Sequence, residues 1–173
     1  MTGVLQPTPR PTPAVTIRRA RPGDARAIAR MLSLAFAAYR PLYTNEAYAA
    51  TVLSEAQVLH RLAEGPVWVA VSANDAPCVA TASALATAQG CYVRSMAVLP
   101  AARGQGLGWQ LLEQVERFAR EAGLSRLYLS TTPFLDRAIA LYGRYGFRRS
   151  AEGPSALFGT PLFTMVKGFS DEA

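Results

Sequence analysis

Apolar side chains in this chain fall either into stretches with a helical period or into continuous runs that suit β-strands. The first helical stretch follows a turn at 22–24, where Asp24 is a candidate N-cap, and it ends at Pro41. A second helix is predicted to contain Tyr48 and to run to the stop at Gly65. Two helices are therefore expected early in the chain, ahead of most of the strands.

The third predicted helix has the clearest pattern, with an apolar face, a charged face and a stop at Gly123. Its apolar face is formed by Leu111, Leu112, Val115, Phe118, Ala119 and Ala122. On the charged face, Glu113 and Glu116 precede Arg117 and Arg120 at the i, i+4 spacing that favours ion pairs on a helix. This segment is predicted to pack one side against a sheet.

The predicted strands are runs of apolar and β-branched residues between turn signals. They cover 15–19, 67–71, 78–86, 91–99, 126–131, 147–151 and 162–167. A shorter fourth helix, with Asp136 as its candidate cap, is predicted to end at Gly146. Because 91–131 reads as strand, glycine-rich loop, helix and strand, it predicts two parallel strands joined by a right-handed crossover. The expected fold class is α/β with a mixed sheet.

Length and composition indicate one soluble domain. The chain has 173 residues, of which 50% are hydrophobic and 17% charged, enough apolar material for a single core. Its apolar runs are too short to span a membrane. We expect a proline- and threonine-rich flexible arm at 1–14, the domain at 15–169 and a short tail at 170–173, and we expect a cytoplasmic protein.

The net charge of +6 comes almost entirely from arginine, since Lys167 is the only lysine. An arginine surplus suits a polyanionic partner, but it also arises from the codon usage of a GC-rich genome. No nucleic-acid recognition motif accompanies the charge, so nucleic acid is not expected as a partner. Cys78, Cys91 and the single His60 have no metal-ligand spacing, so neither a metal site nor a disulfide framework is predicted.

The glycine-rich loop between the strand at 91–99 and the third helix is the main candidate for chemistry. It lacks the lysine of a Walker A loop, and Trp109 stands where a dinucleotide-binding fingerprint needs a small residue. The amide groups of 104–108 would nevertheless lie at a helix N-terminus, which attracts phosphate, and Arg103 could add a charge-assisted contact. The loop is therefore predicted to bind a pyrophosphate without a metal.

Two ordered motifs carry a resemblance to a known family. Arg103-x-x-Gly106-x-Gly108 opens the third helix, and a later segment contains Ala138, Leu141, Tyr142, Gly146 and Phe147 at matching spacing. This combination resembles the GCN5-related N-acetyltransferase (GNAT) family. The resemblance implies a mostly antiparallel central sheet with one splayed parallel pair and about four flanking helices. It also implies acetyl-CoA as the acetyl donor and an amine acceptor.

The resemblance further implies which residues bind the donor. The backbone of the motif strand would pair with the pantetheine arm, and the glycine loop would hold the pyrophosphate. Many family members have an asparagine where Leu135 stands, and Asp136 next to it is the candidate for that contact. The implied donor-binding residues are Met96, Ala97, Val98, Arg103, Gly104, Gln105, Gly106, Leu107, Gly108, Asp136 and Ala138.

Tyr142 aligns with the tyrosine that many members use as a general acid toward the departing thiolate. The motif strand offers no acidic residue as general base, so Glu46, Glu152 and an ordered water chain remain candidates. The resemblance points to direct transfer without an acyl-enzyme. The alternative is a non-catalytic domain of the same fold that senses or binds acyl-CoA.

The acceptor is expected between the early helices and the loop that joins the last two strands. Candidate contacts are Tyr39, Tyr43, Glu46, Arg94 and Phe158. Both regions are aromatic and apolar, which favours a weakly polar amine, a peptide or protein N-terminus or a hydrophobic amino-acid derivative over a polycation. Arg94 could pair with an acidic acceptor if it faces the cleft, although a solvated or donor-directed arginine is the alternative. The chain is expected to act as a monomer or a homodimer.

Overall fold

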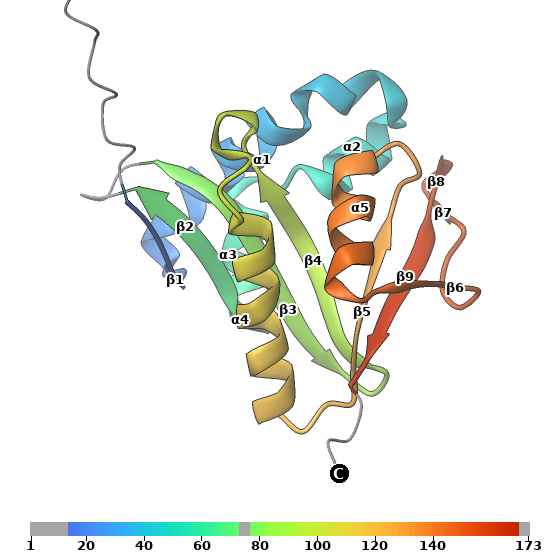
Figure 1. Cartoon of the computed structure of the whole chain (residues 1–173). Helices are drawn as coiled ribbons and strands as arrows, with labels where there is room; N and C mark the ends of the chain where they lie inside the picture. Colours follow the sequence, from blue (N-terminus) through green and yellow to red (C-terminus); the bar gives the residue numbers. More distant parts are fainter. Residues whose placement is uncertain (1–13, 73–76, 170–173) are drawn as a thin grey trace, which may run out of the picture.

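The structure is a computed structural model that describes residues 14–72 and 77–169. The expected arm, apart from Ala14, and the expected tail lie outside the described residues. In the described part, a seven-stranded mixed sheet is covered by helices on both faces (Figure 1). This arrangement confirms the predicted fold class.

The central sheet has the strand order β1-β2-β3-β4-β5-β9-β6, and a separate two-stranded ribbon pairs β7 with β8. Neighbouring strands are antiparallel except for β4 and β5, the parallel pair that the sequence predicted. The strands are β1 (Val15–Arg19), β2 (Val67–Ser72), β3 (Cys78–Thr87), β4 (Gly90–Val98), β5 (Arg126–Thr131), β6 (Arg148–Ser150), β7 (Ala156–Leu157), β8 (Thr160–Pro161) and β9 (Phe163–Gly168).

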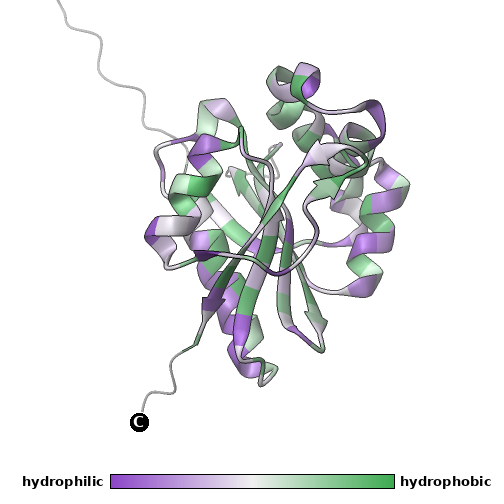
Figure 2. Cartoon of the chain, turned by 90° about the vertical axis from the view of Figure 1, so that its right-hand side faces the viewer, coloured by the Kyte–Doolittle hydropathy of each residue, from purple (hydrophilic) through white to green (hydrophobic). Residues whose placement is uncertain are grey.

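The helices divide the apolar interior into two clusters. One cluster lies between the sheet and the helices α4 and α5, and the other lies between the sheet and the helices α1 and α3. In Figure 2 the apolar colour follows the strands, and the hydrophilic colour lies mainly on the outer helices. The helices are α1 (Ala25–Phe36), α2 (Asn45–Thr51), α3 (Glu55–Glu64), α4 (Leu107–Glu121) and α5 (Asp136–Tyr145), with 3₁₀ turns at η1 (Pro22–Asp24), η2 (Ala37–Leu42) and η3 (Pro100–Ala102).

The single helix predicted between Tyr48 and Gly65 is wrong, because the structure contains two helices there. The chain leaves α2 at Val52 in an extended conformation, and Leu53 is buried. Ser54 then starts α3 with a capping box, in which its hydroxyl accepts from the amide of Gln57 and the Gln57 side chain accepts from the Ser54 amide. A strong local cap therefore overrides the apolar periodicity.

Two predicted N-caps also differ in the structure. Asp24 occupies the N-cap position of α1 but makes no side-chain cap bond there. Its carboxylate pairs instead with Arg18 at 2.8 Å and accepts from the amide of Arg21 at 2.7 Å, so it closes the preceding turn. Asp136 is the first residue of α5 and not its cap, a position that Leu135 occupies.

Of the two ion pairs predicted on α4, Glu116–Arg120 is present at 2.9 Å.

The parallel strands β4 and β5 pair only at their beginning and then diverge (Figure 1). Their register contains Cys91 opposite Leu127 and Tyr92 opposite Tyr128. Farther along β4, the pairing with β3 shifts at Ser95, whose positive φ of 50° marks a β-bulge. The bulge bends β4 away from β5 and leaves an opening between the two strands.

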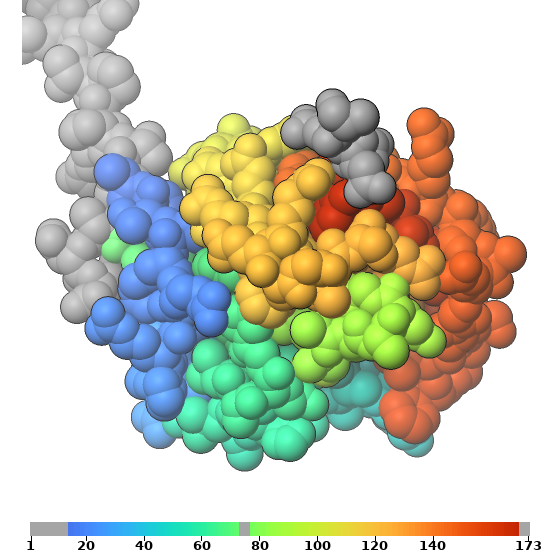
Figure 3. All heavy atoms as spheres, turned by 90° about the horizontal axis from the view of Figure 1, so that it is seen from below, coloured from blue at the N-terminus to red at the C-terminus, as the bar shows by residue number. Residues whose placement is uncertain are grey.

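The opposite end of the sheet is tightly closed. In Figure 3 the β3–β4 turn (light green) lies against the connection that leads from α4 into β5 (orange-yellow). Arg126 joins these segments by donating from Nε to the carbonyl of Gln89 at 2.6 Å. Since this end is held and the other diverges, the opening lies at the carboxyl ends of β4 and β5.

In the described ranges, no helix has the length and apolarity that crossing a membrane requires.

Candidate active site

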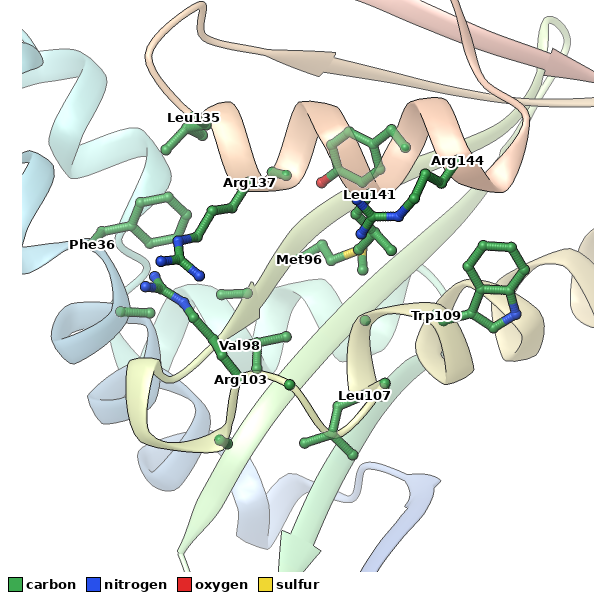
Figure 4. A pocket seen from close by; sticks show the side chains of 18 of the residues that line it. Phe36, Met96, Val98, Arg103, Leu107, Trp109, Leu135, Arg137, Leu141 and Arg144 are labelled. Carbon is green, nitrogen blue, oxygen red and sulfur yellow. The ribbon is translucent and has the colours of Figure 1, made fainter.

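A cavity of about 460 Å³ lies at the carboxyl end of β4, between the glycine loop, the start of α4 and the inner face of α5 (Figure 4). We call it the loop cavity. It is lined by Ala35, Phe36, Tyr39, Met96, Ala97, Val98, Ala102, Arg103, Gly104, Gly106, Leu107, Gly108, Trp109, Leu135, Arg137, Ala138, Leu141, Tyr142 and Arg144. Most donor-binding residues predicted from the sequence are therefore brought together here, whereas Gln105 and Asp136 do not line it.

The glycines of the loop present only backbone to this cavity. Gly106 is the N-cap of α4 with a φ of 71°, and it provides no side-chain cap for the helix. Gly104 has a φ of 81°, and a side chain added there would meet open space. Because the first amides of a helix have no intrahelical acceptor, they remain available to an anion at this end of α4.

Gly108 has a different role, which is to let two helices approach each other. A Cβ at this position would lie 2.6 Å from Cδ2 of Leu141 on α5 and 3.5 Å from Cε of Met96 on β4. A side chain at Gly108 would therefore require Leu141 to move away from α4. This contact between α4 and α5 was not predicted from the sequence.

Three arginines give the loop cavity its charge. In Figure 4 the guanidinium groups of Arg103 and Arg137 lie toward each other, and Arg144 extends along α5 above Met96. Arg137 and Arg144 were not identified from the sequence. Their spacing of seven residues, with Leu141 between them, places both on the same side of α5. This spacing was the sequence signal from which they could have been found.

A second cavity of about 380 Å³ lies beside the first, and we call it the splay cavity. It is lined by Phe36, Tyr43, Ala50, Thr51, Arg61, Tyr92, Val93, Arg94, Ser95, Met96, Leu129, Ser130, Thr131, Thr132, Leu135, Tyr142, Pro154, Ala156, Leu157 and Leu162. Four residues line both cavities: Phe36, Met96, Leu135 and Tyr142. The two cavities therefore meet at the bulge of β4 and the middle of α5.

Tyr142 is the only ionisable group among these four shared residues. Its side chain is buried, and its ring contacts Phe147 with centroids 5.7 Å apart. Burial, with a smaller contribution from Tyr43, raises the pKa of the Tyr142 hydroxyl above its usual value. The hydroxyl therefore keeps its proton throughout the neutral and mildly alkaline range.

The predicted acceptor residues are only partly brought together. Tyr43 and Arg94 line the splay cavity, while Tyr39 lines the loop cavity and stacks on Phe134 with ring centroids 6.1 Å apart. Glu46 is exposed in the first turn of α2, and Phe158 is 64% exposed; neither lines a cavity.

Neither cavity has an acidic residue among its described lining residues. Glu152, the other candidate base, is exposed and pairs with Arg126 at 3.2 Å.

Cys78 and Cys91 are free and buried, and burial raises the pKa of the Cys78 thiol to about 12. Within 14–72 and 77–169, no three or more His, Cys, Asp or Glu side chains cluster closely enough to hold a metal ion.

The family model described as the Acetyltransferase (GNAT) family matches residues 28–147. This chain belongs to the GNAT family. The match contains β4, the glycine loop, α4 and α5, which are the elements that form the loop cavity. The resemblance inferred from the two sequence motifs is thereby confirmed.

Curated relatives of this GNAT chain match it over a shorter segment. An uncharacterized N-acetyltransferase, YjgM of Escherichia coli strain K12, is 49% identical over 57 residues, which is 33% of this chain and 34% of the relative. An IAA acetyltransferase of Azospirillum brasilense is 45% identical over 67 residues, 39% of this chain and 42% of the relative. The chain thus matches well under half of the length of either relative.

Solved structures share the fold over nearly their whole length. The PaiA N-acetyltransferase of Thermoplasma acidophilum, in complex with coenzyme A, has a TM-score of 0.76 at 15% identity and covers 90% of this chain and 99% of its own. YncA of Salmonella typhimurium, with acetyl-CoA, has a TM-score of 0.69 at 23% identity, covering 92% and 96%. At these identities the likeness concerns the fold alone.

Proposed function

We propose that this GNAT chain transfers an acetyl group from acetyl-CoA directly to the amino group of an acceptor. The observation that carries the proposal is the pair of cavities that meet at Tyr142 and Met96. A donor in the loop cavity and an acceptor in the splay cavity would reach each other only at this point. The names of the curated relatives, both acetyltransferases, support the same reaction class.

The residues of the loop cavity fit coenzyme A. Uncapped amides at the start of α4 and the guanidinium groups of Arg103, Arg137 and Arg144 suit its phosphates, and the open space at Gly104 admits them. We assign the phosphate contacts to these groups, with Gly106 and Leu107 supplying backbone amides. When bound, acetyl-CoA supplies a thioester, an acetyl group that is activated toward an amine.

The backbone of β4 suits the arm of the donor. The amide of Leu99 donates to the carbonyl of Val79 on β3 at 2.8 Å. Because backbone groups alternate in direction along a strand, the amide and carbonyl of Val98 face the opening instead of β3. Val98 is therefore the position from which β4 offers backbone bonds to the donor and to the developing oxyanion.

In this proposal Tyr142 is the general acid. The acceptor nitrogen forms a bond to the acetyl carbon as the carbon–sulfur bond breaks, and the Tyr142 hydroxyl gives its proton to the sulfur. The hydroxyl is protonated at neutral pH, and the phenolate left after the transfer regains its proton from water. Since no described lining residue is acidic, we assign the proton lost by the acceptor amine to water and not to Glu46 or Glu152.

The test measures CoA thiol release and acetylated product with a panel of primary amines. Tyr142→Phe should lower kcat by about 10²-fold, within the range for loss of a positioned acid, with little change in acetyl-CoA affinity. Tyr145→Phe is the matched control, because Tyr145 lies on the same helix and lines neither cavity.

Two results would contradict parts of this proposal. Unchanged kcat in Tyr142→Phe would remove the acid role but not the transfer reaction. Tight acetyl-CoA binding by the wild type without thiol release toward any amine would favour the alternative, a non-catalytic domain that binds acyl-CoA.

A further inference from the structure

Two guanidinium groups lie together in the wall of the splay cavity, outside the assigned donor site. Arg61 comes from α3 and Arg94 from β4, and their side chains are only 18% and 17% exposed. Long charged side chains are rarely this buried unless they are paired. Two such charges in a largely apolar wall therefore need negative charge beside them.

The protein supplies only part of the negative charge that this pair needs. Glu64 accepts from Nη2 of Arg94, lies 3.8 Å from Nε of Arg61 and is also 3.6 Å from Nε2 of His60. One carboxylate is therefore shared by two permanent cations. Nε of Arg94 is buried without a hydrogen-bond partner among the described residues.

The two cations also affect each other. Burial and the nearby positive charge of Arg94 lower the pKa of Arg61, while Glu64 opposes that shift. A second anion beside the pair would relieve this repulsion. Guanidinium groups pair most strongly with planar carboxylates, through parallel hydrogen bonds.

The position of the pair relative to the transfer point sets the size of the ligand. Arg94 stands two residues before Met96 on β4, with the bulge at Ser95 between them. The other residues that line this cavity include the apolar or aromatic Tyr92, Tyr43 and Leu157. A small molecule can therefore hold its amine near Tyr142 and an anionic group near the arginines.

We infer that the splay cavity takes a small acceptor that carries both an amine and a carboxylate, such as an amino acid with an apolar side chain, and that Arg61 and Arg94 bind the carboxylate. This inference rests on the proposed function, because it treats the splay cavity as the acceptor site. Among the acceptors expected from the sequence, it selects the hydrophobic amino-acid derivative and assigns its carboxylate to two arginines, of which the sequence indicated only Arg94. Glu64 is a positioning residue that holds Arg94 and competes with the ligand for it.

The first experiment compares amino acids with their amides in binding, without turnover. The full chain is saturated with CoA and titrated calorimetrically with leucine, methionine and phenylalanine and with the three corresponding amides. We expect at least one acid to bind about tenfold or more tightly than its amide, the value of one charge-assisted hydrogen bond. Equal binding of every acid and its amide, or no detectable binding of any, overturns the inference.

The second experiment removes each charge separately. Arg94→Gln and Arg61→Gln should each weaken binding of the acid by about 10-fold to 100-fold and leave the amide unchanged. Arg117→Gln, on an exposed face of α4 that lines neither cavity, is the matched control and should change neither. Loss of acid and amide binding together would indicate structural damage. In that case the Glu64→Gln variant described next decides whether the inference holds.

Glu64→Gln is expected to act in the opposite direction. The amide oxygen of glutamine can still accept from Arg94, but the competing negative charge is gone, so the acid should bind about threefold to tenfold more tightly. A damaged fold cannot produce tighter binding that is confined to the acid. Unchanged or weaker acid binding in Glu64→Gln contradicts the assignment.

Turnover separates this inference from the proposed function. Acid-selective binding without thiol release would retain the carboxylate site and overturn acetyl transfer. Thiol release that is equally fast with acids and amides would support acetyl transfer and overturn the carboxylate site.

Discussion

The loop cavity and the splay cavity are built in different ways although they share a wall. The loop cavity is lined mainly by two continuous segments, 96–109 and 135–144, to which α1 and η2 add Ala35, Phe36 and Tyr39. The splay cavity takes side chains from α1, α2, α3, β4, β5 and the loop before β9. A site formed by continuous segments can be recognised as a sequence motif. A site formed by side chains from many elements changes its shape and charge whenever one of those residues is replaced.

This difference matches the proposed roles. The amides of a helix N-terminus bind phosphate irrespective of side chains, and in the loop cavity arginines add positive charge around them. The splay cavity has no such backbone receptor among its described lining residues, so its specificity depends on its side chains. The comparison predicts that substitutions in the two cavities affect donor and acceptor separately.

The largest effect is expected from removing charge in the loop cavity. Arg103→Gln combined with Arg137→Gln should weaken CoA binding by about 100-fold or more, since each lost charge-assisted contact contributes about 1.5–3 kcal/mol. Calorimetric titration with CoA measures the change. Titration with dephospho-CoA shows whether the arginines bind the ribose phosphate or the pyrophosphate.

The control for this pair is Arg117→Gln, which removes the same charge from α4 outside both cavities. CoA affinity that falls equally in the control would mean that general electrostatic attraction, and not the cavity, accounts for the effect.

A second, intermediate effect is expected at the contact between α4 and α5. Gly108→Ala places a Cβ 2.6 Å from Leu141, and such overpacking should destabilise the fold by about 1–3 kcal/mol. CoA affinity should fall with it, because α4 and α5 form opposite walls of the loop cavity. Thermal unfolding and CoA titration measure the two effects.

Two further variants isolate the cause at Gly108. Leu141→Ala in the Gly108→Ala background makes room for the new methyl group and should recover part of the loss, as a double-mutant cycle would show. Gly143→Ala, on the same helix α5 with open space around it, should be neutral or stabilising by up to about 1 kcal/mol. A loss at Gly143 equal to that at Gly108 would argue against the packing role.

The smallest effect is expected at the wall of the splay cavity. Leu157→Ala removes an apolar contact near Tyr43 and should raise the KM for an apolar acceptor by about threefold to tenfold, the equivalent of about 1 kcal/mol. The affinity for CoA should not change, because Leu157 does not line the loop cavity. A parallel loss of CoA affinity would contradict the separation of the two cavities.

Much of the loop cavity could be predicted because its signals are local. Arg103, Gly106 and Gly108 stand within six residues at a junction between a strand and a helix, and Tyr142 falls in a second motif. The roles predicted for these residues remain predictions, although the structure places them around one cavity. Asp136 and Gln105 carried the same expectation but line neither cavity.

Other features were not predicted, either because a local signal was overlooked or because they depend on distant contacts. The break between α2 and α3 has a local signal, the capping-box pair Ser54 and Gln57, but the apolar periodicity alone does not register it. The β7–β8 ribbon, which lies inside a segment expected to be a loop, is anchored by Thr44, whose hydroxyl donates to the carbonyl of Phe158 at 2.8 Å. Such a contact joins residues more than a hundred positions apart and leaves no local signal.

The amino-acid sequence by itself determined the order of helices and strands, except for the α2–α3 break and the β7–β8 ribbon, and it determined the helix that begins at a glycine loop and the family. Each of these follows from spacing within a few turns of chain, where steric and hydrogen-bonding preferences act directly. Only the tertiary structure decided which arginines of the surplus gather. Arg137 and Arg144 join Arg103 at the loop cavity, and Arg61 meets Arg94 across the splay cavity. Charges far apart in the chain become neighbours only when the sheet and its bulge position them.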